Sequence, residues 1–228
     1  AALRGADAVL AFTRSAAALS ALEPLVRRLV PWNPAPPSAG PHASAWLARA
    51  LEALGLGASP DPPPLAFTDA ERREAERRTA GLPPGFVAVH PGSGSPAKNW
   101  PADRFARAAS TLAAGAPWLL VHGPAEEGWA APHGVVLARE WPLRVLGAAF
   151  ARAGLFLGND SGASHLAAAA GAPTLAVFGP TDPALWAPVG RAVSVRRAPS
   201  GVVADVAVDD VVAAARALRS AASGPPSG

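Results

Sequence analysis

The sequence predicts an α/β protein whose larger part is a parallel sheet between two layers of helices. Short apolar runs recur along the second half of the chain, and helix-patterned segments with short connections separate them. Such runs are typical of strands that are buried on both faces, and the alternation of strand and helix is typical of a parallel sheet. Polar, glycine-containing loops follow several of the runs, so we expect these loops to gather at one edge of the sheet.

The first 80 residues are expected to form a separate, smaller part. Their apolar residues are spaced as in strands and helices, and two proline-rich stretches interrupt them. Pro24 disturbs the first helical pattern, because proline removes a backbone donor. In order, we expect a strand at 6–13, a helix at 15–29, a surface loop at 31–41, a helix at 42–56 and a stiff linker at 59–64.

A charged helix is expected to close this first part. Thr68 and Glu71 have the spacing of a capping box, which predicts a helix from there through Ala80. Its charged residues are expected to form a solvated face with Glu–Arg pairs.

Residues 81–222 are expected to form the sheet domain, and residues 223–228 a disordered tail. Within the sheet domain, strands are predicted at 86–90, 118–122, 135–138, 155–157, 174–178 and 192–195. Helices are predicted at 102–114, 143–153 and 208–222, with a short apolar helix at 167–170 that lies close to the sheet.

Composition excludes several classes of protein. Half of the 228 residues are hydrophobic, there is no cysteine, and the formal net charge is only +3. A disulfide or a thiolate site is therefore excluded. We expect no membrane span, no signal peptide and no nucleic-acid partner, because no long uninterrupted apolar run and no basic–aromatic patch is present.

The stretch after the strand at 155–157 is the first candidate site. Asp160, Ser161, Gly162 and His165 stand where a strand ends and a helix begins. The first turn of a helix has unpaired N–H groups that suit a phosphate, and an ionised Asp160 can accept hydrogen bonds from sugar hydroxyls. The alternative is structural: Asp160 or Ser161 caps the helix and His165 packs in the core.

The loop after the strand at 86–90 is the second candidate. It contains Gly92, Ser93, Gly94 and Ser95, followed by Lys98. Glycines leave the backbone free to wrap an anion, the serines donate hydrogen bonds and the lysine supplies charge. The spacing does not match the P-loop motif, and the alternative is a flexible surface loop.

Acidic residues follow the strand at 118–122. Glu126 or Glu127 can bind a ribose diol, or can simply face water at the start of a helix. Three histidines, His90, His122 and His165, fall near the same edge, but no ligand spacing supports zinc, so no metal site is expected.

Three motifs together carry a resemblance to a known family. HPGSGSPAKNWP (90–101), HGPAEE (122–127) and GNDSGASHLAAAAGAPTLAVFGPTDP (158–183) resemble the C-terminal half of glycosyltransferase family nine, the ADP-heptose:lipopolysaccharide heptosyltransferases. The likeness covers residues 81–222. The first segment resembles the later part of that family's N-terminal domain.

The resemblance implies the GT-B architecture, in which two Rossmann-like domains face each other, here with a shortened or truncated N-terminal part. It implies that the sheet domain binds a nucleotide-sugar donor, ADP-linked as in that family, without an obligatory metal or other cofactor. Carried over by position, Ser93 and Ser95 contact the diphosphate with Gly94 between them, and Lys98 neutralises it. Glu126 meets the ribose and Asp160 holds sugar hydroxyls. The remaining pocket residues are Ser161, Gly162 and His165.

The sequence departs from the family at its beginning. The family's first strand leads to a glycine-rich loop with an acid that is expected to be the catalytic base, whereas the first strand here is followed by Thr13 and Arg14. The base is therefore expected outside this chain. Either an N-terminal part is absent from the sequence or the acceptor domain is reduced, and we favour the first, because a half-domain would expose sheet edge.

The resulting expectation is a glycosyltransferase that moves a heptose or related sugar to a glycolipid or polysaccharide acceptor with inversion. Lys98 would stabilise the charge of the leaving diphosphate. The expected location is the cytoplasm, with peripheral association at the inner face of the cytoplasmic membrane. The alternatives are a non-catalytic nucleotide-sugar-binding module and a nucleotide-sugar epimerase of similar fold.

Overall fold

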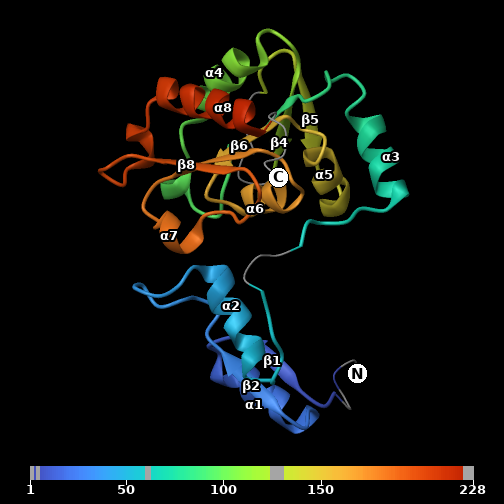
Figure 1. The fold of residues 1–228 in the computed structure, drawn as a ribbon, viewed down its shortest axis with the longest axis vertical. Helices are drawn as coiled ribbons and strands as arrows, with labels where there is room; N and C mark the ends of the chain where they lie inside the picture. Colours follow the sequence, from blue (N-terminus) through green and yellow to red (C-terminus); the bar gives the residue numbers. More distant parts are fainter. Residues whose placement is uncertain (1–2, 4–5, 60–62, 124–130, 223–228) are drawn as a thin grey trace. The chain divides into compact units, whose positions relative to one another are not determined.

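The chain divides into two compact units. A computed structural model describes residue 3 and residues 6–59, 63–123 and 131–222 (Figure 1). Contacts group residues 1–62 with 184–186 in a smaller unit, and residues 63–183 with 187–228 in a larger one. The helix α3 (Asp69–Arg78), which the sequence placed in the first part, therefore lies in the larger unit.

The smaller unit contains a two-stranded parallel sheet. Its strands are β1 (Val9–Phe12) and β2 (Leu29–Trp32), and its helices are α1 (Ala16–Leu22) and α2 (Ala43–Glu52). The predictions of a helix at 15–29 and a loop at 31–41 were wrong over residues 29–32, because these residues form the strand β2. The helix ends early because Pro24 falls in a 3₁₀ turn, Glu23–Leu25. Pro31 is tolerated in β2 because a two-stranded sheet has only edge strands.

The larger unit contains a parallel sheet of six strands in the order β5-β4-β3-β6-β7-β8 among the residues described. The predicted strands and helices of this unit are confirmed, with small shifts at their ends. The strands are β3 (Val87–His90), β4 (Trp118–His122), β5 (Val135–Arg139), β6 (Leu155–Asn159), β7 (Thr174–Phe178) and β8 (Val193–Arg197). The other helices are α4 (Ala102–Ala113), α5 (Leu143–Phe150), α6 (Gly162–Ala169) and α8 (Val208–Ala222). The short helix α7 (Pro183–Trp186) follows β7, and its residues 184–186 are grouped with the smaller unit.

The strand order reverses direction between β3 and β6. The chain builds outward from β3 through β4 to β5, then returns to the centre and builds the other way from β6 to β8. β3 and β6 are direct neighbours, with His90 opposite Gly158. In open α/β sheets ligands bind at such a switch point, beyond the carboxyl ends of the strands.

Helices cover both faces of this sheet, as the continuous apolar runs predicted. Val89 and Leu157 point into a core shared with α4 and α8, and Ala88 and Phe156 point into a second core with α5. Figure 1 shows α4 and α8 on one side of the sheet and α5 and α3 on the other.

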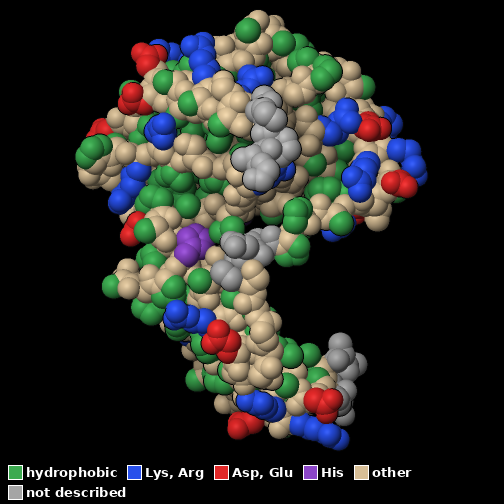
Figure 2. All heavy atoms as spheres, viewed as in Figure 1, with side chains coloured by type: hydrophobic (Ala, Val, Ile, Leu, Met, Phe, Trp, Pro, Cys, Tyr) green, Lys and Arg blue, Asp and Glu red, His purple; other side chains and the backbone are tan. Residues whose placement is uncertain are grey.

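Helix α3 exposes charged residues to solvent and also contacts helix α5 through one of them. Its predicted capping box is present, with Thr68 and Glu71 exchanging both hydrogen bonds. Glu74 pairs with Arg77 and Arg78 along the helix, as predicted. Glu71, however, pairs with Arg144 of α5. Basic and acidic side chains accordingly lie side by side over this part of the surface (Figure 2).

Glu71 therefore ties two helices together through its charge. Hydrogen bonds from Arg144 and then from the backbone of Thr68 lower the pKa of Glu71 from 4.5 to about 2. The same pair raises the pKa of the Arg144 guanidinium. The ionised form of Glu71 is the one that holds α3 on α5.

Candidate functional site

The loops that follow β3 and β6 are joined at the switch point. The buried side chain of Asn159, the last residue of β6, donates from Nδ2 to the carbonyl of Pro91 (2.6 Å). Its Oδ1 accepts from the backbone N–H of Trp100 (2.9 Å). Asn159 thus clamps both ends of the loop that carries Lys98, which fixes that loop against β6. The prediction from sequence did not include this residue in the site.

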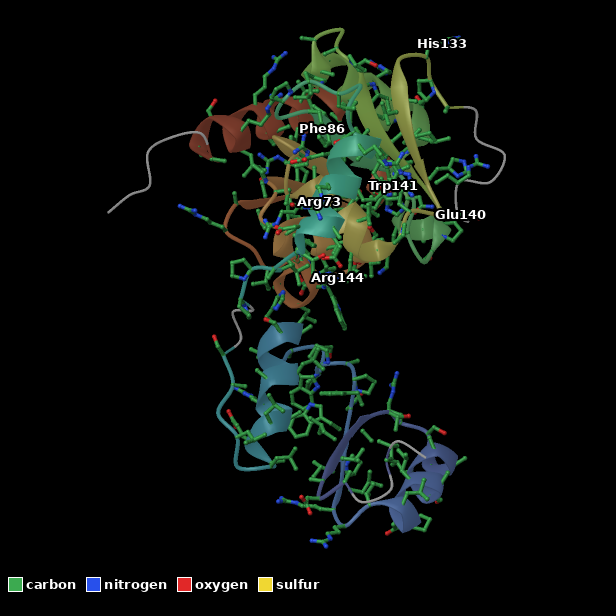
Figure 3. The ribbon with its side chains drawn as sticks, turned by 90° about the vertical axis from the view of Figure 1, so that its right-hand side faces the viewer. Arg73, Phe86, His133, Glu140, Trp141 and Arg144 are labelled. Carbon is green, nitrogen blue, oxygen red and sulfur yellow. The ribbon has the colours of Figure 1, made fainter. Side chains whose placement is uncertain are left out.

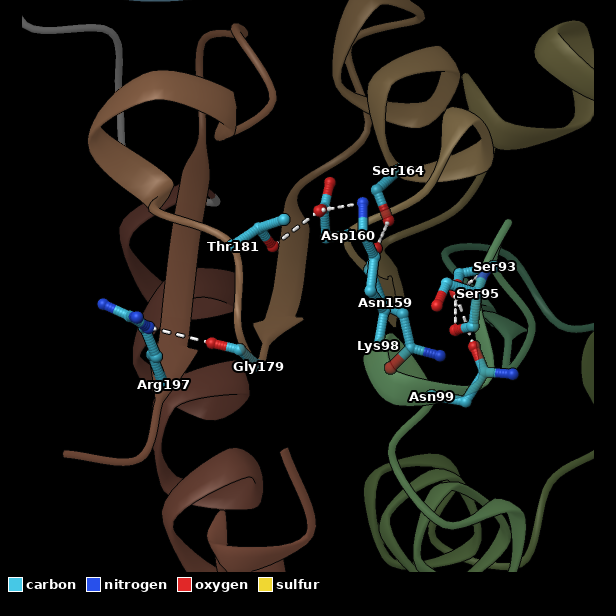
Figure 4. A network of polar contacts seen from close by, with 10 residues as sticks. All are labelled: Ser93, Ser95, Lys98, Asn99, Asn159, Asp160, Ser164, Gly179, Thr181 and Arg197. Carbon is cyan, nitrogen blue, oxygen red and sulfur yellow. Dashed lines mark hydrogen bonds and ion pairs between the residues drawn. The ribbon is translucent and has the colours of Figure 1, made fainter. Parts of the chain in front are cut away.

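Lys98 and Asp160 form an ion pair across the same junction. The Lys98 Nζ lies 2.7 Å from Asp160 Oδ2, and Asp160 is 7% exposed. The hydroxyl of Thr181, in the turn after β7, donates to the same Oδ2 (2.7 Å). Figure 4 shows Lys98 and Thr181 approaching the carboxylate from two different loops. The other oxygen, Oδ1, receives no hydrogen bond from any residue that the structure describes.

Ser93 holds the loop in shape. Its Oγ lies 2.6 Å from Asn99 Oδ1 and 2.9 Å from the carbonyl of Ser95, and it accepts from the Ser95 N–H (3.3 Å). Gly94 has open space where a Cβ would stand, with no atom within 4 Å. The contact of Ser93 and Ser95 with a diphosphate stays a prediction, but the loop that would make it is ordered by Ser93.

The N-terminus of α6 lies beside this ion pair. Ser161 occupies the N-cap position but makes no capping hydrogen bond, so the prediction that Asp160 or Ser161 caps the helix was wrong. Both side chains are drawn to neighbours instead: Asp160 to Lys98, and Ser161 to within 3.4 Å of the His90 ring. No atom lies within 4 Å of the place of a Cβ on Gly162. An anion can therefore approach the first turn of α6, where the N–H groups and the helix dipole favour it.

A cavity opens at the same sheet edge, beyond β4 and β5. It has a volume of about 300 Å³, and Val121, Ala138, Trp141 and Leu146 form apolar walls. His122, Arg139 and Glu140 are its polar lining, and Arg139 donates to the His122 Nε2 at 3.4 Å. A mainly apolar space with a few polar groups is typical of a small-molecule site. The prediction from sequence missed this cavity.

The chain turns sharply where this cavity begins. Glu140, directly after β5, has a left-handed φ of 53°, which is uncommon for a residue with a side chain. The turn places Trp141 against the cavity, and the Arg78 guanidinium lies 5.3 Å from the centre of its ring. Figure 3 shows Glu140 and Trp141 at this turn, with Arg144 on α5.

The remaining predicted residues have mixed outcomes. Glu126 and Glu127 lie outside the described residues. His165 is exposed in the first turn of α6, not packed in a core. In the part of the chain that the structure describes, no group of three or more His, Cys, Asp or Glu could hold a metal ion. None of the helices described there is long and apolar enough to cross a bilayer.

The fold and site define a doubly wound α/β domain with an anion-suited switch point and a neighbouring, mainly apolar cavity. The chain belongs to glycosyltransferase family 9 (heptosyltransferase), whose family description matches residues 31–210. This confirms the resemblance that the three motifs carried.

Known relatives agree with that assignment. Lipopolysaccharide heptosyltransferase 3 of Escherichia coli is 30% identical over 137 residues, which are 55% of this chain and 39% of that protein. The chain thus spans well under half the length of that curated relative.

Solved structures show the same fold. E. coli ADP-heptose lps heptosyltransferase II has a TM-score of 0.74 and 22% identity, and the match covers 95% of this chain and 77% of that one. A glycosyl transferase family 9 protein from Veillonella parvula DSM 2008 gives 0.70 and 22%, covering 88% and 65%. E. coli heptosyltransferase WaaC with ADP gives 0.64 and 21%, covering 95% and 75%. The α/β fold, with a parallel sheet of the GT-B type, is therefore confirmed.

Proposed function

We propose that this chain binds the nucleotide-sugar donor of a sugar transferase, with the diphosphate at the switch point between β3 and β6. One observation carries the proposal: a lysine, a buried carboxylate and the open first turn of α6 meet there, beside a cavity sized for a heterocycle. Each group suits one part of a nucleotide sugar. Together they follow the order of its parts along one sheet edge.

In this proposal Lys98 and the amides of α6 receive the diphosphate. When the bond from the sugar to the diphosphate breaks, negative charge develops on the leaving phosphate. A fixed ammonium and a helix N-terminus stabilise that charge without reorganisation, which is electrostatic catalysis. The proposal needs no cofactor, because these groups supply the positive charge.

The other parts of the donor have separate partners. Asp160 Oδ1, which no described residue bonds, would accept from sugar hydroxyls. Val121, Trp141 and Leu146 would enclose the base. Glu126 would bind the ribose, and Ser161 and His165 would complete the pocket. A similar structure, E. coli heptosyltransferase WaaC with ADP, supports an adenine nucleotide as the donor's carrier.

The acceptor side of the reaction is also a proposal. The relatives' names support transfer of a heptose, or a related sugar, to a glycolipid or polysaccharide acceptor. The expected course is inversion, with a base outside this chain taking the proton of the acceptor hydroxyl. A glycolipid acceptor would place the reaction in the cytoplasm, with the enzyme peripherally at the inner face of the cytoplasmic membrane.

Calorimetric titration tests the donor site directly. The 228-residue chain is titrated with ADP, UDP and GDP, and so are Lys98→Ala and, as a control, Arg107→Ala on α4. We expect one nucleotide to bind, ADP by preference. Binding should weaken about ten- to a hundredfold in Lys98→Ala, because a hydrogen bond between charged groups contributes about 1.5–3 kcal/mol. The affinity of Arg107→Ala should be unchanged.

Two results would contradict the proposal. If the folded chain binds no nucleotide, the site does not work in this chain. If Lys98→Ala binds as tightly as the parent, the loop after β3 is not part of the site. Turnover of a nucleotide sugar without any acceptor would instead indicate an epimerase.

A further inference from the structure

Lys98, the cation that the proposed site offers to a diphosphate, is already paired with Asp160. Lys98 Nζ lies 2.7 Å from the Asp160 carboxylate, and the lysine side chain is 30% exposed against 7% for the aspartate. The two groups come from different loops, at residues 98 and 160, so the pair is formed by the fold and not by local sequence. Burying a carboxylate to this extent is costly unless a cation or a hydrogen-bond donor faces it.

A diphosphate and Asp160 compete for the same positive charge. One ammonium can contact both, but it cannot neutralise both. As Lys98 turns toward the diphosphate, Asp160 keeps one described partner, the Thr181 hydroxyl, which donates to Oδ2. The carboxylate is then a poorly compensated buried charge next to an incoming anion. Free diphosphate therefore binds against this cost.

An intact nucleotide sugar brings its own compensation. Sugar hydroxyls are donors, and Asp160 Oδ1 has no donor among the described residues. Thr181 holds Oδ2 and so keeps the carboxylate oriented while Lys98 moves away. The hydroxyls replace the hydrogen bonds that Asp160 loses, so the donor is bound without leaving the carboxylate unsatisfied.

We propose that the Lys98–Asp160 pair makes the site discriminate between the intact nucleotide sugar and the free nucleoside diphosphate, by exchange of Lys98 between Asp160 and the diphosphate. The inference rests on the proposed function and adds a consequence for release. After the sugar leaves with the acceptor, Asp160 loses its hydroxyl donors and recaptures Lys98. The grip on the diphosphate product weakens, and the product dissociates.

The decisive variant is Asp160→Asn, measured by calorimetry with ADP and with ADP-heptose on the 228-residue chain. Asparagine keeps the size of the side chain and an acceptor oxygen, but it removes the charge that holds Lys98. The parent should bind ADP-heptose at least about tenfold more tightly than ADP. Asp160→Asn should bind ADP about tenfold more tightly than the parent does, and should lose most of that preference.

Controls separate this effect from a change of net charge or of fold. Glu76→Gln removes one carboxylate at the other end of the domain, where it pairs with Arg152, and should leave both affinities unchanged. Thr181→Val should weaken both ADP and ADP-heptose, because Asp160 then loses the described donor that remains when Lys98 turns away, and Thr181→Ser should restore the parent values. If Asp160→Asn does not fold, Asp160→Ser provides the same comparison.

If Asp160→Asn binds ADP no more tightly than the parent does, the proposed exchange of Lys98 between Asp160 and the diphosphate is refuted, while nucleotide binding itself stands. A parent chain with equal affinity for ADP and ADP-heptose would overturn it too. Absence of nucleotide binding in the parent and in every variant is a different result, because it refutes the proposed function and with it the inference.

Discussion

Replacement of Asn159 by alanine should destabilise the larger unit and loosen the loop that carries Lys98. The Asn159 side chain is fully buried and bonds the carbonyl of Pro91 and the N–H of Trp100. Both backbone groups belong to buried residues, so alanine leaves a donor and an acceptor without partners. Each unsatisfied group costs about 1–3 kcal/mol, so we expect a loss of about 3 kcal/mol in the free energy of unfolding.

Two measurements check this value. Urea unfolding followed by tryptophan fluorescence gives the free energy, and hydrogen exchange of the Trp100 amide gives the local effect. A loss of about 3 kcal/mol corresponds to exchange about a hundredfold faster at that amide. ADP affinity should fall as well, because the Lys98 loop loses its anchor on β6.

A control and a refutation follow from the same structure. Thr111→Ala removes an exposed hydroxyl that bonds the Arg107 carbonyl (2.9 Å), and it should change stability by less than about 0.5 kcal/mol. A loss below about 1 kcal/mol for Asn159→Ala, with Trp100 exchange unchanged, would refute the reasoning that this side chain clamps the loop.

Three further predictions address the phosphate site, the base cavity and the packing of α3. Gly162→Ala should fold normally, because a Cβ there meets no atom within 4 Å. Calorimetry should nevertheless show ADP binding at least about tenfold weaker, since the methyl group fills the approach to the first turn of α6. Trp141→Ala should weaken ADP but not inorganic pyrophosphate, because it removes a wall of the cavity only. The free energy of unfolding should fall as the pH drops from about 4.5 toward 2, because the pKa of Glu71 is about 2 in the folded chain and 4.5 ordinarily. Glu71→Gln should reduce this pH dependence, as measured by urea unfolding at several pH values.

Each of these has a matched comparison. Gly57→Ala, at a position equally open but in the smaller unit, should leave ADP affinity unchanged. Trp141→Phe keeps an aromatic wall and should retain most of the affinity. If Trp141→Ala lost affinity for ADP and for pyrophosphate equally, the cavity would not be the binding site of the base. If the stability of Glu71→Gln depended on pH as that of the parent does, the Glu71–Arg144 pair would not be the source of the stability lost at low pH.

Much of the larger unit could be predicted from the order of its residues. Runs such as Leu155–Leu157 are apolar throughout because both faces of the strand are covered, and the structure places them in two cores. The capping box of Thr68 and Glu71 is a local interaction and was predicted from four consecutive residues. The first helix was predicted too long, because its leucine spacing continued past Pro24 into residues that form β2.

Within the site, the sequence could indicate residue types but not their partners. It placed Lys98 and Asp160 in polar loops after two strands, which parallel strands bring to one edge. It could not show that they bind each other, since 62 residues separate them. Either Asp160 or Ser161 was considered as the cap of α6, but the Ser161 side chain makes no capping hydrogen bond and lies near His90, on the neighbouring strand.

The sequence by itself therefore determined the α/β class, the order of strands and helices in the larger unit, the family, and the loops in which a site can lie. These depend on periodicity and on local chemistry, which a linear sequence records. Only the tertiary structure decided the clamp of Asn159, the role of Thr181 and the cavity beside Trp141. Each of these joins segments from different strands, and their distances follow from how the sheet packs.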